Sequence, residues 1–359
     1  MKKVGKFLLC FVPLILMLFI NVVVSYVALF FIAFKDAATG NVAASTPEAV
    51  TEYVEQLITN PEFLLQATVI FQFVCLFVAA IVYGLGMKKG RIKKDTHKVN
   101  GFAISGILFL FAGASLLVTL FMEGVSVLLP EVMEKYAEMM ESSGLTEMSL
   151  ISTIATLVLA PIAEEIVFRG ITFKFARSFS KKFWIANCIQ ALAFGIAHLN
   201  IVQGTYAFAL GLLFGYLYKK YNTLIAPMLG HCVFNFAGTY LTTFVYGDSE
   251  ELSTMKLLSI VGLTAILMGL GIVLLIKDKN KKDNEEAFMA RWRRETFKKP
   301  AQPVAQPQAA TAYNTVTEAV NAQANATSAN PYGPGTPYVP NGTAEEKKPE
   351  NSENVFDKY

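Results

Sequence analysis

The chain has 359 residues, with 31 lysines and arginines, 28 aspartates and glutamates, and a formal net charge of +3. Hydrophobic residues make up 53% of it and charged residues only 16%, whereas a soluble domain carries about 25% charged residues. This composition excludes an ordinary soluble globular protein and places most of the chain in a bilayer, and we expect no nucleic-acid partner.

Long apolar runs separated by charged segments predict an all-α, polytopic membrane protein with about eight transmembrane helices. The first run could imitate a signal peptide, but it is too long for one and has no Ala-x-Ala site, so we interpret it as an uncleaved span. The predicted spans cover about residues 7–34, 63–87, 101–122, 148–175, 183–199, 204–218, 223–246 and 257–276.

Two polar segments between spans show helical spacing of apolar residues and predict short helices lying on the membrane surface. The first set is Val50, Tyr53, Val54 and Leu57; the second is Val132, Met133, Tyr136, Met139 and Met140. The sixth span carries Gly211 and Gly215, a GxxxG spacing that allows close helix approach. Four cysteines in apolar runs are expected to be small buried residues, not disulfides or metal ligands: Cys10, Cys75, Cys188 and Cys232.

The charge of the connecting segments predicts the orientation. Basic clusters alternate with acidic loops at every proposed crossing, so both termini are expected in the cytoplasm. The basic clusters are 2–6, 88–98, 174–182, 219–220 and 277–282, and the acidic loops are 48–62, 123–147 and 248–251.

We therefore divide the chain into four parts. Residues 1–148 hold the first three spans with two acidic outer loops, 149–246 form a core of spans four to seven, and 247–276 hold the eighth span. Residues 277–359 form a basic juxtamembrane segment, which is either a lipid-binding or a stop-transfer element, and a disordered cytoplasmic tail.

Charged residues inside an apolar span mark a functional site. Glu164, Glu165 and Arg169 lie in the fourth span. Glu165 and Arg169 are four residues apart and share a helix face in the favourable order, so Glu165 is expected to neutralise Arg169. Glu164 lies about 100° round the helix and is left to face a polar cavity as a general base. Pro161 removes a backbone hydrogen bond one turn earlier and could give water a route to the site.

Two further spans contribute polar residues, His198 from the fifth and His231 with Asn235 from the seventh. A base, a histidine able to hold the same water, and donors for an oxyanion suffice to hydrolyse an amide. Singly, a Glu–Arg pair is more readily structural and an asparagine can be an interhelical hydrogen bond. Together, these polar groups on three spans favour function. The neighbouring Phe168, Phe194, Phe234 and Phe236 are most simply lipid-facing or packing residues.

The order Glu-Glu-x-x-x-Arg, Phe-x-x-x-His and His-x-x-x-Asn, each on its own apolar helix, resembles the CPBP family. That family contains the type II CAAX prenyl endopeptidases and bacterial Abi and bacteriocin-immunity-related membrane proteases. The resemblance covers about 150–245 and extends to Ala160-Pro161, Phe168-Arg169-Gly170 and Ala226-Pro227. It implies an all-helical membrane protease with three pairs of site residues. Glu164 and His198 would activate water, and Glu165 and Arg169 would support the site. His231 and Asn235 would stabilise the oxyanion.

The family is often labelled as metalloproteases, which leaves the cofactor open. Glu164, His198 and His231 could supply three zinc ligands, but the chain has no His-Glu-x-x-His motif. We favour hydrolysis without a cofactor, with a divalent metal such as zinc as the alternative.

Two other functions fit the same residues. One is a proton-coupled transporter with Glu164 and His198 as a proton relay, although no internal repeat supports a carrier. The other is a non-catalytic immunity or scaffold protein. The expected partners of the protease are membrane lipid and a peptide or membrane-protein substrate, and the expected location is a bacterial plasma membrane, where prenylated substrates are not expected.

Overall fold

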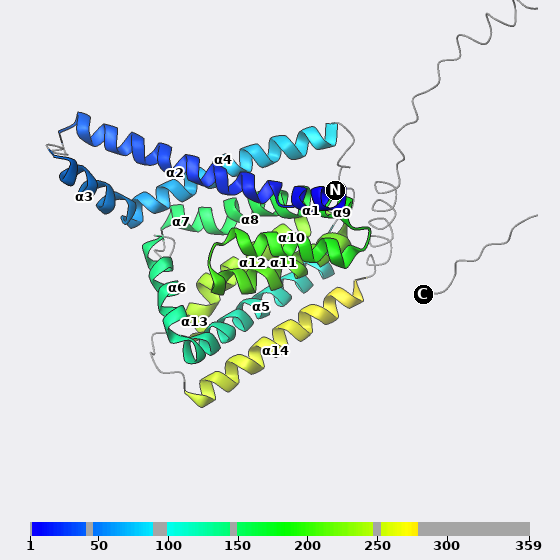
Figure 1. The fold of residues 1–359 in the computed structure, drawn as a ribbon. Coiled ribbons are helices and arrows are strands. Elements are labelled where there is room, and N and C mark those ends of the chain that lie inside the picture. Colours follow the sequence, from blue (N-terminus) through cyan, green and yellow to red (C-terminus); the bar gives the residue numbers. More distant parts are fainter. Residues whose placement is uncertain (1, 41–45, 89–98, 144–148, 247–252, 279–359) are drawn as a thin grey trace, which may run out of the picture. The chain divides into compact units, whose positions relative to one another are not determined.

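The computed structural model describes residues 2–40, 46–88, 99–143, 149–246 and 253–278, and these residues contain helices and no strands. The first half forms α1 (Lys2–Leu9), α2 (Val12–Ala38), α3 (Pro47–Ile58), α4 (Pro61–Lys88), α5 (Gly101–Leu128) and α6 (Pro130–Ser142) (Figure 1). The second half forms α7 (Leu150–Ile154), η1 (Ala155–Leu159), α8 (Ala160–Glu165), η2 (Ile166–Thr172), α9 (Phe173–Phe179), α10 (Phe183–Ala197), α11 (Ile201–Tyr221), α12 (Ile225–Phe236), η3 (Ala237–Leu241), α13 (Thr242–Tyr246) and α14 (Thr254–Lys277). The three η elements are π-helical.

Six of the described helices are long and apolar enough to cross a membrane, and they start at or near six of the predicted spans. The other two predicted spans are also helical. One is α10, a shorter apolar helix of 15 residues, and the other is the continuous run from α12 through η3 to α13. The chain is therefore an all-α, multi-pass membrane protein, as predicted. The first span is interrupted after Leu9, where the ring of Pro13 clashes with the carbonyl four residues earlier.

Charge separates along the helix axes. Figure 1 places α1, α9 and the C-terminal ends of α4 and α14 at one end of the helices, and α3 and α6 at the other. The first end carries the lysines of α1 and those that close α4 and α14, whereas α3 and α6 are acidic. This distribution agrees with the alternation of charge along the sequence. The cytoplasmic location of the termini and the four-part division of the chain stay predictions. Most of the loop 88–98, the loop 248–251, and the tail from residue 279 lie outside the described residues.

Short polar residues start the helices as their sequence indicates. The Thr46 side chain accepts a hydrogen bond from Ala49 N at 3.3 Å, and Asn60 accepts one from Phe63 N at 3.0 Å. Both are followed directly by a proline, whose missing N–H costs nothing at the first helical position. Such caps fix where the long helices begin and hence which faces they present to each other.

The helices α3 and α6 coincide with the two predicted surface helices, but their surroundings differ. No residue of α3 is buried, whereas the apolar face of α6 packs on protein and buries Tyr136, whose hydroxyl lies 3.4 Å from that of Tyr206. A membrane-surface position for α3 stays a prediction. For α6, Tyr136 is buried and the other apolar residues of the face are partly exposed, so a membrane-surface position stays a prediction there too.

The α10–α11 pair is packed as the GxxxG spacing predicts. A Cβ on Gly211 would lie 3.0 Å from the Cα of Ala191, and one on Gly215 would overlap the side-chain oxygen of Asn187. The amide of Asn187 donates to Leu212 O at 3.1 Å. The two glycines therefore bring the α10 side chains into hydrogen-bonding reach of the α11 backbone.

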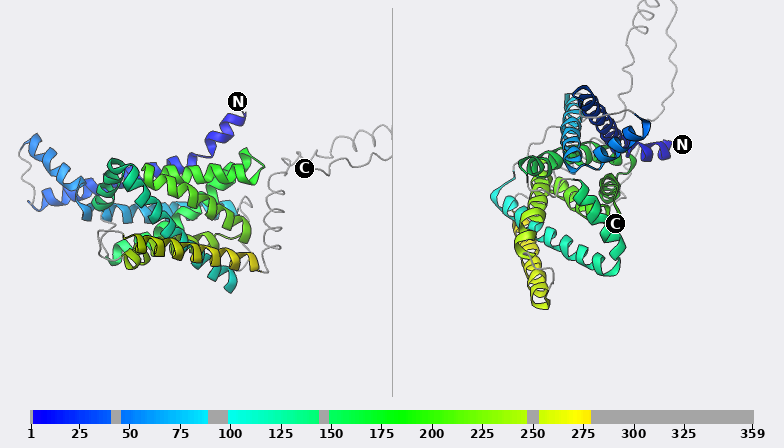
Figure 2. Two further views of the ribbon diagram at one scale, coloured as in Figure 1. Left: turned by 90° about the horizontal axis from the view of Figure 1, so that it is seen from below. Right: turned by 90° about the vertical axis from the view of Figure 1, so that its left-hand side faces the viewer.

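One expectation about the cysteines is wrong. All four are free, and Cys10 and Cys75 are buried, but Cys188 is exposed on the surface of α10 and Cys232 is intermediate. Figure 2 shows two further directions of view onto the helices. Because a membrane helix can face lipid with apolar side chains, an apolar run alone does not distinguish buried positions from lipid-facing ones.

The close contact between α5 and α14 also depends on glycine, at Gly271. A Cβ added at Gly271 would lie 2.5 Å from the backbone nitrogen of Leu110, which cannot move aside as a flexible side chain can. We expect Gly271→Ala to lower the stability of the protein in detergent by about 1–3 kcal/mol, the usual cost of overpacking. The measurement is unfolding by heat or by denaturing detergent.

Gly269, on the same helix, has nothing within 4 Å of an added Cβ. Gly269→Ala is the matched control, and it should be neutral or stabilising by up to about 1 kcal/mol because alanine is the better helix former. Equal unfolding midpoints for the two variants would show that α14 does not pack on α5 in this way.

Candidate active site

The residues of the three motifs come together from three adjoining helices. Glu164, Glu165 and Arg169 lie on the continuous helix through α8 and η2, His198 caps the C-terminus of α10, and His231 lies on α12. The helix α12 contacts α8, and α10 contacts η2. The glutamates and His231 therefore share one site, as the sequence predicts.

Glu165 and Arg169 form the expected ion pair. Arg169 Nη1 donates to Glu165 Oε1 at 2.7 Å, and both side chains are fully buried. The guanidinium carbon lies 4.5 Å from the ring centroid of Phe194 and 4.9 Å from that of Phe214, within cation–π distance of both. A charged group so buried needs this close pairing, since an unpaired charge in a low-dielectric interior is costly.

Glu164 is the accessible member of the acidic pair. Its side chain is 19% exposed, whereas that of Glu165 is 0% exposed, and its Oε2 lies 3.8 Å from His231 Nε2. The two adjacent carboxylates thus differ in the way that their positions on the helix predict. Glu165 belongs to the buried pair, and Glu164 is partly exposed beside it.

His231 joins both glutamates. Its Nδ1 lies 3.0 Å from Glu165 Oε1, the same oxygen that accepts from Arg169. An ionised carboxylate can only accept, so Nδ1 donates, and a neutral ring then offers a lone pair at Nε2, the atom facing Glu164. The imidazole is stacked on the ring of Phe214, with centroids 4.9 Å apart and planes at 22°. The orientation of His231 is therefore fixed from two sides.

His198 is held by the backbone of its own helix. Its Nδ1 lies 2.9 Å from the carbonyl of Phe194, so Nδ1 donates there and Nε2 is the free acceptor. The rings of His198 and His231 both pack on the Phe194 ring, at 5.0 and 5.8 Å between centroids. Within the described part of the chain, His198 makes no hydrogen bond to Glu164. Their sharing of one water stays a prediction.

Asn235 lies one helical turn after His231, and its amide nitrogen donates to the backbone carbonyl of Thr156 at 2.8 Å. That bond joins α12 to η1. Oxyanion stabilisation by His231 and Asn235 stays a prediction, and each of these side chains already has one donor engaged with the protein.

Helix α11 carries none of the motif residues but completes the site. The carbonyl of Gly211 accepts from Arg169 Nη2 at 3.3 Å and from Gln190 Nε2 at 2.8 Å, and α11 also supplies the Phe214 ring. Gln190 and Phe214 were not predicted as site residues. Polar Asn187 and Gln190 inside the apolar run of α10 were the available signal.

Of the aromatic residues expected to pack or face lipid, Phe168 and Phe194 are buried beside Arg169, Phe234 is buried, and Phe236 is exposed.

A metal ion needs several donor side chains converging on one point. In the described residues, no group of three His, Cys, Asp or Glu side chains has that arrangement, so the proposed ligand set of Glu164, His198 and His231 does not fit a zinc ion here. Metal dependence itself stays open to measurement.

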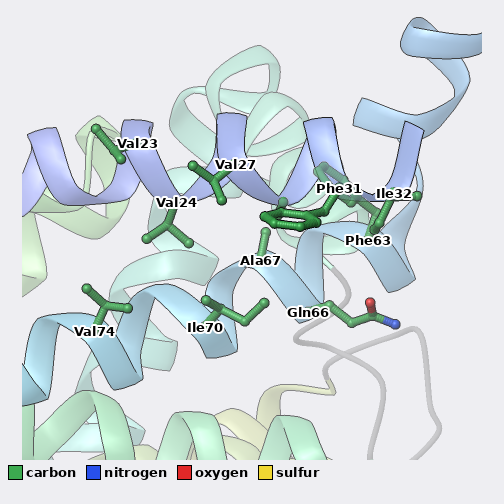
Figure 3. Close-up of a pocket in the computed structure, with 11 residues that line it drawn as sticks. Val23, Val24, Val27, Phe31, Ile32, Phe63, Gln66, Ala67, Ile70 and Val74 are labelled. Atoms are coloured by element: carbon green, nitrogen blue, oxygen red, sulfur yellow. The ribbon is translucent and has the colours of Figure 1, made fainter. Parts of the chain in front are cut away.

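Two apolar grooves lie elsewhere in the described residues. One of about 390 Å³ runs between α2 and α4, with Gln66 as its single polar lining residue (Figure 3). Another of about 150 Å³ is lined by α2, α4, η2 and α9. Neither is lined by Glu164 or a histidine, and the polar cavity expected beside Glu164 stays a prediction.

Comparison with known proteins agrees with the three motifs. Residues 146–237 match the model of the family described as type II CAAX prenyl endopeptidase Rce1-like. A stretch of 82 residues is 32% identical to the protein named "Putative membrane peptidase YdiL" of Bacillus subtilis (strain 168). It covers 23% of this chain and 33% of that relative. No solved structure matches the chain. The resemblance inferred from the motifs is confirmed for this region.

Proposed function

We propose that this protein is an intramembrane endopeptidase of the CAAX type, which hydrolyses a peptide bond with water activated by Glu164 and histidine. The observation that carries the proposal is the approach of Glu164 Oε2 to His231 Nε2 at 3.8 Å, with Glu164 accessible and Glu165 sealed against Arg169. The match of residues 146–237 to a protease family model supports the reaction class.

The geometry supports a position for the nucleophilic water. Atoms 3.8 Å apart can both accept from one water at ordinary distances of about 2.8 Å. With Nδ1 of His231 donating to Glu165, the free acceptors are Nε2 and the Glu164 carboxylate. A water donating one hydrogen to each keeps its lone pairs for attack on a carbonyl carbon.

The proton inventory follows from these contacts. Glu164 takes one proton of the attacking water and passes it, through Nε2 of the neighbouring His231, to the leaving nitrogen, so that Glu164 returns to a carboxylate. Glu165 holds His231 in the required tautomer through Nδ1, as an orienting carboxylate does in other hydrolases. His198, with its Nε2 free, is a second acceptor at the edge of the site.

Comparison of membranes from cells carrying the wild-type chain and the Glu164→Gln variant tests this function. Glutamine keeps the shape of the side chain but cannot act as a base, so an uncut peptide or membrane protein should accumulate in the variant. Quantitative proteomics of the membrane fraction identifies it. A phenotype of the wild-type chain that Glu164→Gln retains, with no accumulating peptide, would support a non-catalytic membrane protein instead.

The metal-free mechanism predicts that a chelator leaves activity unchanged. Purified protein is incubated with its substrate before and after dialysis against a strong chelator, and then with added zinc. Activity that is lost with chelator and restored by zinc would contradict the arrangement of Glu164 and His231 described above. The control is a known zinc protease treated in parallel.

A further inference from the structure

The backbone of η1 leaves one carbonyl without its usual donor. In this π-helical turn, the N–H of Ala160 bonds to Ala155 O, five residues back, and not to Thr156 O, four residues back. The residue five after Thr156 is Pro161, which has no N–H. Neither helical register therefore supplies a backbone donor to the carbonyl of Thr156.

Asn235 supplies that donor from another helix. Its amide nitrogen lies 2.8 Å from Thr156 O, and 79 residues separate the two along the chain. An unpaired carbonyl in a membrane interior is costly, because no water reaches it. The Asn235 side chain thus supplies the hydrogen bond that the π turn and Pro161 together remove from the Thr156 carbonyl.

The bond also connects the two sides of the site. Thr156 lies on the helix that continues into α8 and Glu164, while Asn235 lies one turn beyond His231 on α12. The bond therefore joins the helix that carries Glu164 to the helix that carries His231, whose Nε2 lies 3.8 Å from Glu164 Oε2.

We propose that Asn235 is a positioning residue that clamps α12 to η1 through the Thr156 carbonyl, and that Pro161 is present because it keeps this carbonyl available. Asn235 then contributes to the reaction by holding His231 at its distance from Glu164. The stability half of this proposal stands alone, and the activity half rests on the proposed peptidase function.

Unfolding of five variants in detergent tests the clamp: Asn235→Ala, Pro161→Ala, Pro227→Ala, and the two double variants that combine Asn235→Ala with each proline change. Asn235→Ala should lower the unfolding midpoint in the wild-type background. In the Pro161→Ala background the same change should cost much less, because a backbone N–H at position 161 lets the helix satisfy its own carbonyls. Pro227→Ala is the matched control: Pro227 lies in the first turn of α12, where no helical hydrogen bond is lost, so the cost of Asn235→Ala should be unchanged there.

The kinetic arm separates positioning from direct contact with the substrate. Asn235→Ala should lower kcat by about 10- to 100-fold, the scale of a small misplacement, with little change in KM. The Pro161→Ala/Asn235→Ala double variant should then match Pro161→Ala alone. An equal loss of kcat in both backgrounds, with an unchanged midpoint, would assign Asn235 to the oxyanion and overturn the clamp.

Two further variants keep the test decisive. If Pro161→Ala does not fold, Asn235→Asp replaces it: the ionised side chain keeps its size but cannot donate, so the midpoint should fall as in Asn235→Ala, and an unchanged midpoint overturns the proposal. Repeating the unfolding series in the inactive Glu164→Gln chain tests the clamp without any peptidase activity. Failure of the clamp and failure of the proposed function are thereby distinguished.

Discussion

Glu164→Gln is expected to lower kcat by about 10²–10⁴-fold, the usual contribution of a general base, while the unfolding midpoint stays that of the wild type. The carboxylate is 19% exposed and lies 3.8 Å from Nε2 of His231, which the tautomer above leaves uncharged, so its removal breaks no buried ion pair. Steady-state kinetics on the purified protein, with detergent unfolding on the same sample, measure both quantities.

Glu134→Gln on the exposed face of α6 is the control for loss of one negative charge, and it should change neither quantity. The decisive comparison is with the same substitution one residue along the chain. Glu165→Gln should lower the unfolding midpoint as well as activity, because Glu165 is buried with Arg169 and His231. If Glu164→Gln retained wild-type kcat, Glu164 could not be the base.

Arg169→Leu should produce the largest loss of stability. It leaves the Glu165 carboxylate fully buried without its guanidinium, and breaking a buried pair by removing one partner costs about 3–5 kcal/mol. It also removes the donor to Gly211 O and the cation between the rings of Phe194 and Phe214. Unfolding in detergent measures the loss.

A second substitution separates charge from packing. The Glu165→Gln/Arg169→Leu double variant carries no unpaired charge, so it should be more stable than Arg169→Leu alone, even though more native contacts are removed. Lys135→Met, which removes an exposed cation from α6, should leave stability nearly unchanged. A double variant less stable than either single variant would mean that the pair is held by packing and not by its charges.

The sequence was informative where the cost of polar groups in a membrane is high. Two adjacent glutamates, an arginine and two histidines in apolar runs identified the site, and the spacing of Glu165 and Arg169 predicted their pairing because helix geometry alone determines it. The lengths of the apolar runs predicted where the long helices lie, because a helix that crosses a bilayer needs about 20 apolar residues.

The partners of His231, His198 and Asn235 could not be derived in this way. Each depends on how one helix lies against another, and on where a π turn shifts the backbone register. His231 bonds to Glu165, His198 to the Phe194 carbonyl, and Asn235 to Thr156. The burial of Tyr136 on α6 was equally hidden, because an amphipathic pattern does not distinguish lipid from a neighbouring helix.

The shortness of α10 has a consequence for the surrounding lipid. Its 15 residues rise only about 22 Å, less than the roughly 30 Å of a hydrocarbon core. Hydrophobic mismatch of this kind is relieved by local thinning of the bilayer or by tilting. His198 caps the C-terminal end of this helix, where the backbone turns through Leu199 at a positive φ of 53°. Membrane thickness thus becomes a variable that sets how far water and a polar peptide must travel to reach the site.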